Sequence, residues 1–206
     1  MGKMIIITAP SGAGKTTIVR HLLKTFDELS FSVSATTRPP RKGEVDGKDY
    51  YFLSEKKFKK KIEKEKFVEW EEVYPGKYYG TLKKEVKRIW KKGKHIVFDI
   101  EVKGATNIKN YFGDKALAVF IKPPSMKELM RRLENRDTEN STTIKVRMAR
   151  AKLEMTYEHN FDKVLVNDDL EIALKEAEER IAEFINQPVK KKKKKNKKKK
   201  EKKNKK

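Results

Sequence analysis

A glycine-rich stretch, Ala9-Pro10-Ser11-Gly12-Ala13-Gly14-Lys15-Thr16-Thr17, carries the strongest chemical signal in the sequence. It follows the apolar run 4–8 and precedes a segment with helical spacing of apolar residues. In such a strand–loop–helix unit, backbone N–H groups converge on phosphate oxygens at the helix N-terminus. Lys15 would bring a positive charge to the β- and γ-phosphates, and the Thr16 hydroxyl is suited to ligating Mg²⁺. We therefore predict a nucleotide phosphate site formed by Ser11, Gly12, Ala13, Gly14, Lys15, Thr16 and Thr17.

One position departs from the usual pattern of phosphate-binding loops, because Ala9 stands where a glycine is common. A methyl side chain fits there if the φ angle of the residue is negative. The alternative is a glycine-rich turn that binds nothing, and the strand and helix expected on either side argue against it.

Apolar patterns on both sides of this loop predict an α/β fold. Strand-like runs at 4–8, 95–100, 116–121 and 164–166 alternate with segments of helical spacing at 14–26, 82–91, 102–111, 125–133, 143–157 and 169–185. Such alternation gives a parallel sheet flanked by helices on both faces. A short strand at 31–34 leads into residues 33–81, where prolines, strand-like runs and a Lys-rich helix at 55–64 predict an inserted mixed β lobe. The core would then comprise residues 1–32 and 82–187.

The net charge of +22 is concentrated at the C-terminal end of the 206-residue chain. From residue 190 onward there are 14 lysines and one glutamate, a charge of +13, which leaves +9 for residues 1–189. Residues 188–206 contain too few apolar side chains to offset the entropy of ordering, so we expect a disordered tail. Two interpretations of the tail remain open. It could bind a non-specific anionic partner such as nucleic acid or anionic lipid, or it could be a solvated appendage without function.

Composition also excludes several classes of site. The sequence has no cysteine, which rules out disulfides and thiolate metal sites and is compatible with a reducing compartment. Its apolar runs reach four or five residues, against about 20 for a membrane span, and it has no signal-type segment. We expect a soluble cytoplasmic protein, either monomeric or homo-oligomeric.

The inserted lobe carries a second, more specific signature. It comprises Ser34, Thr36-Thr37-Arg38-Pro39-Pro40-Arg41-Lys42-Gly43-Glu44, Gly47-Lys48-Asp49-Tyr50-Tyr51-Phe52, Glu69-Trp70 and Tyr78-Tyr79-Gly80-Thr81. These segments resemble the nucleoside-monophosphate-binding signature of guanylate kinases, and the resemblance covers nearly all of residues 3–187. It implies a P-loop NTPase fold with a GMP-binding lobe and a helical lid at about 136–147. The implied activity is Mg²⁺-dependent phosphoryl transfer from ATP to GMP, with dGMP as a further candidate acceptor, in purine nucleotide metabolism.

The resemblance implies an acceptor site whose residues divide by the part of GMP they would contact. The 5′-phosphate would be held by Arg38, Arg41, Tyr50 and Tyr79, since guanidinium forks match phosphate oxygens. Glu69 would accept hydrogen bonds from guanine N1–H and the 2-amino group, which adenine cannot offer as a pair. The rest of the implied acceptor site is Ser34 and Thr81, whose hydroxyls would address O6, with Glu44, Asp99 and Glu101. Glu101 stands where the family more often has aspartate.

On the donor side, the resemblance implies a lid and a base-side loop. Asp99 resembles the acidic residue near metal and nucleotide, and Asn167 lies in the loop near the ATP base. The lid arginines would be Arg132, Arg136 and Arg147, although Asp137 replaces the usual glycine after Arg136. Catalysis would then rest on Lys15, Arg38, Asp99, Arg136 and Arg147, acting by position and charge.

Each of these assignments has a plainer alternative. Tyr50, Tyr79 and Trp70 could be core aromatics, Arg136 and Arg147 solvated helix charges, Asp99 a helix cap and Glu69 a surface carboxylate. For the whole chain, the alternatives are an inactive guanylate-kinase-like interaction module and a nucleic-acid-associated protein built around the tail. The intact Gly14-Lys15-Thr16 argues against the first.

Overall fold

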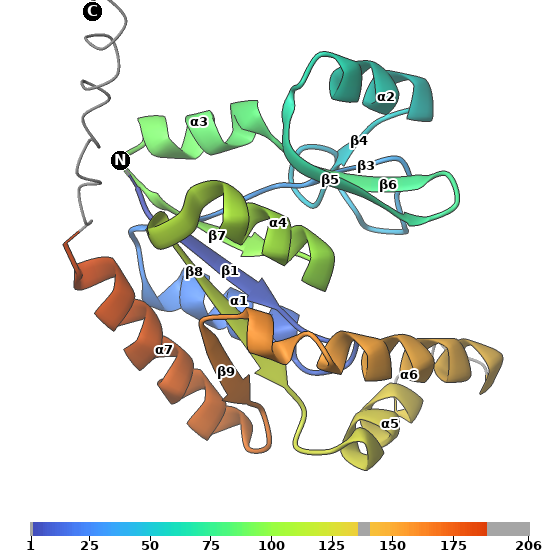
Figure 1. Cartoon of the computed structure of the whole chain (residues 1–206), viewed down its shortest axis with the longest axis vertical. Helices are drawn as coiled ribbons and strands as arrows, with labels where there is room; N and C mark the ends of the chain where they lie inside the picture. The colour runs from blue at the N-terminus through green and yellow to red at the C-terminus, as the bar shows by residue number, and fades with distance from the viewer. Residues whose placement is uncertain (1, 136–140, 189–206) are drawn as a thin grey trace, which may run out of the picture.

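The computed structural model describes residues 2–135 and 141–188. Arg136 and Asp137 of the predicted lid, and the lysine-rich segment from residue 189, lie outside the described residues. A five-stranded parallel sheet forms the core, in the order β2-β7-β1-β8-β9 (Figure 1). Its strands are β1 (Met4–Thr8), β2 (Leu29–Phe31), β7 (His95–Asp99), β8 (Ala116–Lys122) and β9 (Lys163–Val166). The predicted parallel sheet is confirmed.

β1 lies at the centre of this sheet and is buried along its whole length. Ile5 and Ile7 pack on one face against α1 (Lys15–Thr25) and α7 (Leu170–Asn186). Met4 and Ile6 pack on the other face against α3 (Lys83–Lys91) and α4 (Val102–Phe112). Because successive side chains of a strand point to opposite faces, a strand covered by helices on both sides reads as an unbroken apolar run.

A smaller mixed sheet, in the order β4-β3-β6-β5, forms the inserted lobe. Its strands are β3 (Ala35–Thr36), β4 (Tyr51–Phe52), β5 (Phe67–Tyr74) and β6 (Lys77–Leu82); β3 and β4 are parallel and the other pairs antiparallel. α2 (Glu55–Glu63) is capped by the Ser54 side chain and covers this sheet. The ring of Phe58 in α2 stacks on the ring of Phe67 in β5, with 4.4 Å between the ring centres. The lobe therefore has a small core of its own.

Two helices, α5 (Met126–Glu134) and α6 (Ser141–Met155), follow β8 and pack together through Leu129, Leu133 and Ala151. They extend to the right of the sheet in Figure 1, on the same side as the inserted lobe. Two short 3-10 turns, η1 (Gly113–Lys115) and η2 (Glu158–Asn160), precede β8 and β9. This arrangement brings the lobe and the helical pair to the end of the sheet where the phosphate loop lies.

The predicted strand at 31–34 is wrong for residues 32–34, because β2 ends at Phe31. Two residues further on, the Val33 N–H donates to the buried carboxylate of Glu85 in α3, at 3.2 Å. The same carboxylate accepts the Tyr51 hydroxyl at 2.9 Å and binds Arg88. Glu85 thus provides a side-chain partner for the Val33 backbone at the point where the chain leaves the core sheet for the lobe.

Lys3 joins the two ends of the described chain. Its ammonium donates to the carbonyls of Phe184, Ile185 and Gln187, where α7 ends, and lies 4.9 Å from the Phe184 ring centre. A cation at the C-terminal end of a helix satisfies carbonyls that have no partner within the helix. Within residues 2–135 and 141–188, no helix is both long and apolar enough to cross a membrane.

Candidate active site

The glycine-rich stretch forms a tight loop between β1 and α1. Gly12 and Gly14 both have a φ of +92°, in the left-handed region that side chains disfavour. Among the described residues, Glu65 is the one non-glycine with positive φ, so Ala9 has the negative φ that its methyl group requires. The Ala13 N–H donates to the Pro10 carbonyl at 3.1 Å and closes the turn. The deviation at Ala9 leaves the loop conformation intact.

A buried amide braces this loop from outside. Asn167, only 4% exposed, follows β9 and donates from Nδ2 to the Ala13 carbonyl at 2.8 Å. A Cβ on Gly14 would lie 2.2 Å from the same nitrogen, so glycine is needed there for space as well as for φ. Arg132 holds the Asn167 and Asp168 carbonyls at 2.9 and 3.3 Å. The predicted donor residues Asn167 and Arg132 are therefore next to the loop, where they support it.

Lys15 is the first residue of α1, and its ammonium lies where β1 and β7 end. Nζ is 2.7 Å from Asp99 Oδ1 and donates to the Ile100 carbonyl at 3.2 Å. Burial by itself lowers the pKa of Lys15, but the charges of Asp99 and Glu101 outweigh it and the net pKa is raised. Lys15 is therefore held as a cation. The helix-cap alternative for Asp99 is wrong, since Glu101 occupies the N-cap position of α4.

Helix α6, which overlaps the predicted lid, reaches the phosphate loop through Arg147, whose Nη1 donates to Ser11 Oγ at 3.2 Å. This contact rules out a purely solvated helix charge at this position. Thr16 and Thr17 lie in the first turn of α1 with exposed side chains, next to Lys15. The structure thus brings together Ser11, Lys15, Thr16, Asp99 and Arg147 of the predicted donor set.

Arg38 and two tyrosines form a cluster in the lobe. The guanidinium forms a bidentate salt bridge with the Glu44 carboxylate, with both N···O distances 2.6 Å. It also donates to the Pro39 carbonyl at 3.0 Å. It lies 4.8 Å from the ring centre of Tyr50, which contacts Tyr79 edge-on at 6.1 Å. A guanidinium has five N–H donors, so two remain for a phosphate group.

Glu44 organises the loop around this cluster. Hydrogen bonds from Arg38 lower the pKa of Glu44 to about 2, and the backbone N–H of Arg41 donates to the same carboxylate at 2.7 Å. Arg41 is exposed beside it. Glu44 therefore stays ionised and fixes the direction of Arg38, a supporting role that the sequence did not reveal.

Glu69 and Thr81 are direct cross-strand partners on β5 and β6, and both are buried. Glu69 is 9% exposed and lies against α4, where a Cβ on Gly104 would be 3.1 Å from its Oε2. Burial raises the pKa of Glu69 to about 7, against the opposing effect of Thr81. Thr81 Oγ1 has no hydrogen-bond partner among the described residues. A buried carboxylate and an unsatisfied hydroxyl side by side are suited to recognising a polar ligand, so the surface-carboxylate alternative for Glu69 is wrong.

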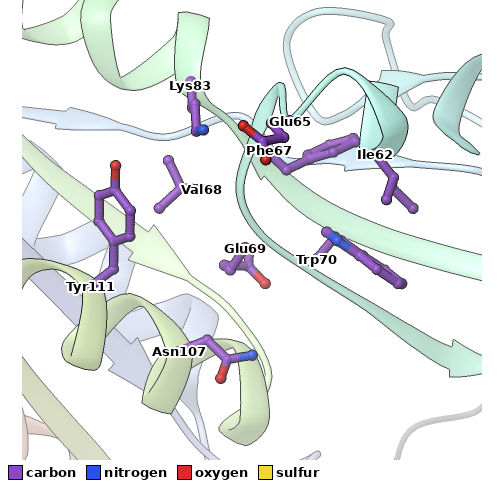
Figure 2. Close-up of a pocket in the computed structure, with 9 residues that line it drawn as sticks. All are labelled: Ile62, Glu65, Phe67, Val68, Glu69, Trp70, Lys83, Asn107 and Tyr111. Carbon is purple, nitrogen blue, oxygen red and sulfur yellow. The ribbon is translucent and has the colours of Figure 1, made fainter. Parts of the chain in front are cut away.

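A pocket of about 580 Å³ lies beside Glu69, at the junction of the lobe with α3 and α4, and its lining residues are drawn in Figure 2. Trp70 is 42% exposed here, so it is not the core aromatic that was the alternative for it. Tyr50 and Tyr79 are half-buried, as is Ser34, whose carbonyl accepts the Tyr51 N–H at 2.8 Å. The pocket is lined by Ile62, Glu65, Phe67, Val68, Glu69, Trp70, Lys83, Asn107 and Tyr111.

Arg150 is the residue that sequence reasoning missed. Its guanidinium donates to Glu101 and to Glu154, each at 2.8 Å, and to the Tyr74 hydroxyl at 3.0 Å. Glu101, expected in the guanine site, is thus paired with α6. A signal existed in the sequence, because Arg150 follows Arg147 by three residues and lies on the same face of a helix.

Comparisons with known proteins identify the family of the chain. The family model described as "Guanylate kinase" matches residues 1–203. A guanylate kinase of Porphyromonas gingivalis is 52% identical over 90% of this chain and 99% of its own length, and one of Bacteroides thetaiotaomicron is 50% identical over 90% and 91%. The crystal structure of guanylate kinase from Anaplasma phagocytophilum has a TM-score of 0.74 at 28% identity, covering 91% of this chain and 88% of its own. The chain belongs to the guanylate kinase family.

Proposed function

We propose how the residues of this chain carry out the reaction of its family, the transfer of the γ-phosphoryl group of ATP to GMP. ATP binds with its phosphates in the loop 9–17, and GMP binds between the inserted lobe and the end of the sheet. The observation that carries this proposal is the closeness of the two half-sites. Helix α6 contacts both of them. Arg147 donates to Ser11 of the phosphate loop at 3.2 Å, and Arg150, one turn later, donates to the Tyr74 hydroxyl of the lobe at 3.0 Å.

On the donor side, the chain supplies position and positive charge. Lys15 and the N–H groups at the start of α1 stabilise the negative charge of the transferring phosphoryl group, and Arg147 adds a cation from α6. Arg136 is assigned the same role from its place in the family pattern. The acceptor oxygen belongs to a phosphate, so no strong protein base is required. Closure of the lobe and lid excludes water as a competing acceptor.

The residues around Lys15 fit a magnesium ion bound together with ATP. Within the described part of the chain, no three His, Asp or Glu side chains gather into a metal cage. Mg²⁺ in phosphoryl-transfer sites commonly takes one or two protein oxygens and completes its octahedron with phosphate oxygens and water. The exposed Thr16 hydroxyl and the Asp99 carboxylate are such hard oxygen donors. When bound, the ion neutralises charge on the β- and γ-phosphates.

On the acceptor side, selectivity for guanine rests on Glu69. Its ionised carboxylate accepts from N1–H and the 2-amino group, while Ser34 and Thr81 address O6. Arg38, Arg41, Tyr50 and Tyr79 hold the 5′-phosphate. These contacts are common to GMP and dGMP, so we propose dGMP as a second acceptor. We also propose a cytoplasmic location, with which the absence of cysteine is compatible.

A comparison of acceptors tests this proposal. ADP production from Mg·ATP is measured with GMP, dGMP, AMP, UMP and CMP in parallel, using the full chain. We expect turnover with the two guanine nucleotides and at most about one hundredth of it with the others, because a buried polar pair left unmatched costs about 1 to 3 kcal/mol at each site. Equal turnover with AMP and GMP would contradict the proposed role of Glu69 in selecting guanine. Nucleotide binding without any ADP production would instead support the inactive interaction module.

A further inference from the structure

Arg150 connects three parts of the molecule that are far apart in the sequence. It belongs to α6, it binds Glu101 at the start of α4 in the core, and it binds Tyr74 at the end of β5 in the lobe. The guanidinium also lies 5.5 Å from the centre of the Tyr74 ring. One side chain therefore joins the lid helix to both the core and the tip of the lobe.

The partners of Arg150 differ in how firmly they can hold it. Glu154 is 6% exposed, and burial raises its pKa while Arg150 opposes that shift. A buried carboxylate that loses its cation is costly, so the pairing with Glu154 fixes Arg150 on α6. Tyr74 is 51% exposed, so its bond to Arg150 can form and break at little cost as the lobe moves.

The same helix also contacts the donor site. Arg147, one turn before Arg150, donates to Ser11 of the phosphate loop. A single continuous helix, Ser141–Met155, thus contacts the ATP loop through one arginine and the GMP lobe through the other. Movement of one contact is transmitted to the other because the helix between them is rigid over a single turn.

We propose that Arg150 is a positioning residue that couples the two substrates. Its bond to Tyr74 joins the lobe to α6, so the closure of the lobe on GMP also places α6, and with it Arg147, against the ATP phosphates. This proposal rests on the proposed function and adds a prediction that the function alone does not make. GMP affinity depends on occupancy of the ATP site, and Arg150 and Tyr74 carry that dependence.

Calorimetric titration of GMP, with and without a non-hydrolysable ATP analogue and Mg²⁺, measures the coupling directly. In the wild type we expect the analogue to raise GMP affinity about fivefold or more. Arg150→Ala should reduce this ratio to within about twofold, and Tyr74→Phe, which removes only the hydroxyl, should remove part of it. The double variant should lose no more than Arg150→Ala, since each single change already removes the bond between Arg150 and Tyr74.

Arg180→Ala is the matched control, because Arg180 makes the same kind of one-turn pair with Glu176 on α7. It should leave the coupling ratio and KM for GMP unchanged. Full coupling in both Tyr74→Phe and Arg150→Ala would overturn the proposal, as would a loss of thermal stability in Arg150→Ala with the coupling ratio intact. If Arg150→Ala fails to fold, Tyr74→Phe decides alone. Wild-type protein that makes no ADP with GMP would refute the proposed function itself, before any variant is compared.

Discussion

Lys15, Arg38 and Arg150 are each held by a carboxylate, contributed by Asp99, Glu44 and Glu101 respectively. Such pairs keep the cations charged and oriented before a substrate arrives, which lowers the reorganisation needed in the transition state. For Lys15 and Arg38, they also mean that an incoming phosphate shares the cation with a carboxylate. The partners of the cations, as much as the cations themselves, therefore set substrate affinity.

Replacement of Lys15 by Met retains most of the side-chain stem and removes the charge. We expect kcat to fall by about 10²-fold or more, because the ammonium stabilises charge on the transferring phosphoryl group. Steady-state kinetics measures this, and circular dichroism confirms that the variant is folded. A folded Lys15→Met protein with near-normal kcat would contradict the phosphate-loop assignment.

Glu69 should make both stability and GMP binding depend on pH. Its pKa is about 7 in the folded protein against an ordinary value of 4.5, so between these values the folded state holds a proton that the unfolded state has released. Stability therefore falls as the pH rises from about 4.5 to about 7. The ionised form is the one that accepts from guanine, so KM for GMP should fall over the upper part of the same range.

Glu69→Gln tests both effects. The amide cannot accept from both guanine donors, and we expect GMP binding to weaken by about 1 to 3 kcal/mol, with KM for ATP nearly unchanged. Calorimetry at pH 6.5 in buffers of different ionisation enthalpy should show proton release on GMP binding that is larger in the wild type than in Glu69→Gln. The GMP phosphate titrates in both proteins, so the difference belongs to Glu69, and equal proton release would exclude its ionisation on binding.

At the scale of elements, the junction of the phosphate loop with α1 depends on a close contact with the loop after β9. Gly14→Ala places a Cβ 2.2 Å from Asn167 Nδ2 at a φ of +92°. Gly93→Ala is the matched control, with a φ of +72° and no described atom within 4 Å of its Cβ. We expect about 1 to 2 kcal/mol of backbone strain in both, and a further 1 to 3 kcal/mol in Gly14→Ala alone from the displaced amide.

Thermal melting and KM for ATP measure this difference. Gly14→Ala should be the less stable of the two and should bind ATP more weakly, because Asn167 no longer holds the Ala13 carbonyl. Gly93→Ala should keep the wild-type KM. Equal stability and equal KM in the two variants would show that the amide does not brace the loop.

The elements that the sequence predicted well are those whose signal is local. The apolar run of β1, the glycines after it and the spacing of α1 lie within 25 residues, and the structure places all three as expected. The end of β2 was not predictable in this way, because the backbone beyond it pairs with Glu85, which reads as an ordinary helix charge. Arg150 was missed for the same reason, since its partners at positions 74 and 101 are distant in sequence. Long-range pairing of charges has no period that a single sequence can display.

At the scale of the whole molecule, the lysine-rich tail should be separable from the enzyme. Lys3 holds the carbonyls of Phe184, Ile185 and Gln187, so a chain ending at Gln187 retains the contacts that Lys3 makes at the end of α7. We expect this truncated chain to keep GMP kinase activity within about twofold. It should lose weak binding to nucleic acid or anionic vesicles that the full chain shows at low salt and loses at higher salt.

Binding titrations at two salt concentrations, paired with the kinase assay, distinguish the outcomes. A collapse of activity on truncation would mean that the tail packs on the body. Unchanged nucleic-acid affinity would place the basic surface within residues 1–187, which carry all of the remaining net positive charge.

The bond between Asn167 and the Ala13 carbonyl spans 154 positions of the chain. A nascent chain that has emerged only as far as β8 contains every residue of the phosphate loop, but it lacks the amide that braces the loop. We therefore expect nascent chains to bind ATP more weakly until translation has passed residue 167, when most of the fold already exists. The first motif to leave the ribosome would thus be among the last to reach its full affinity.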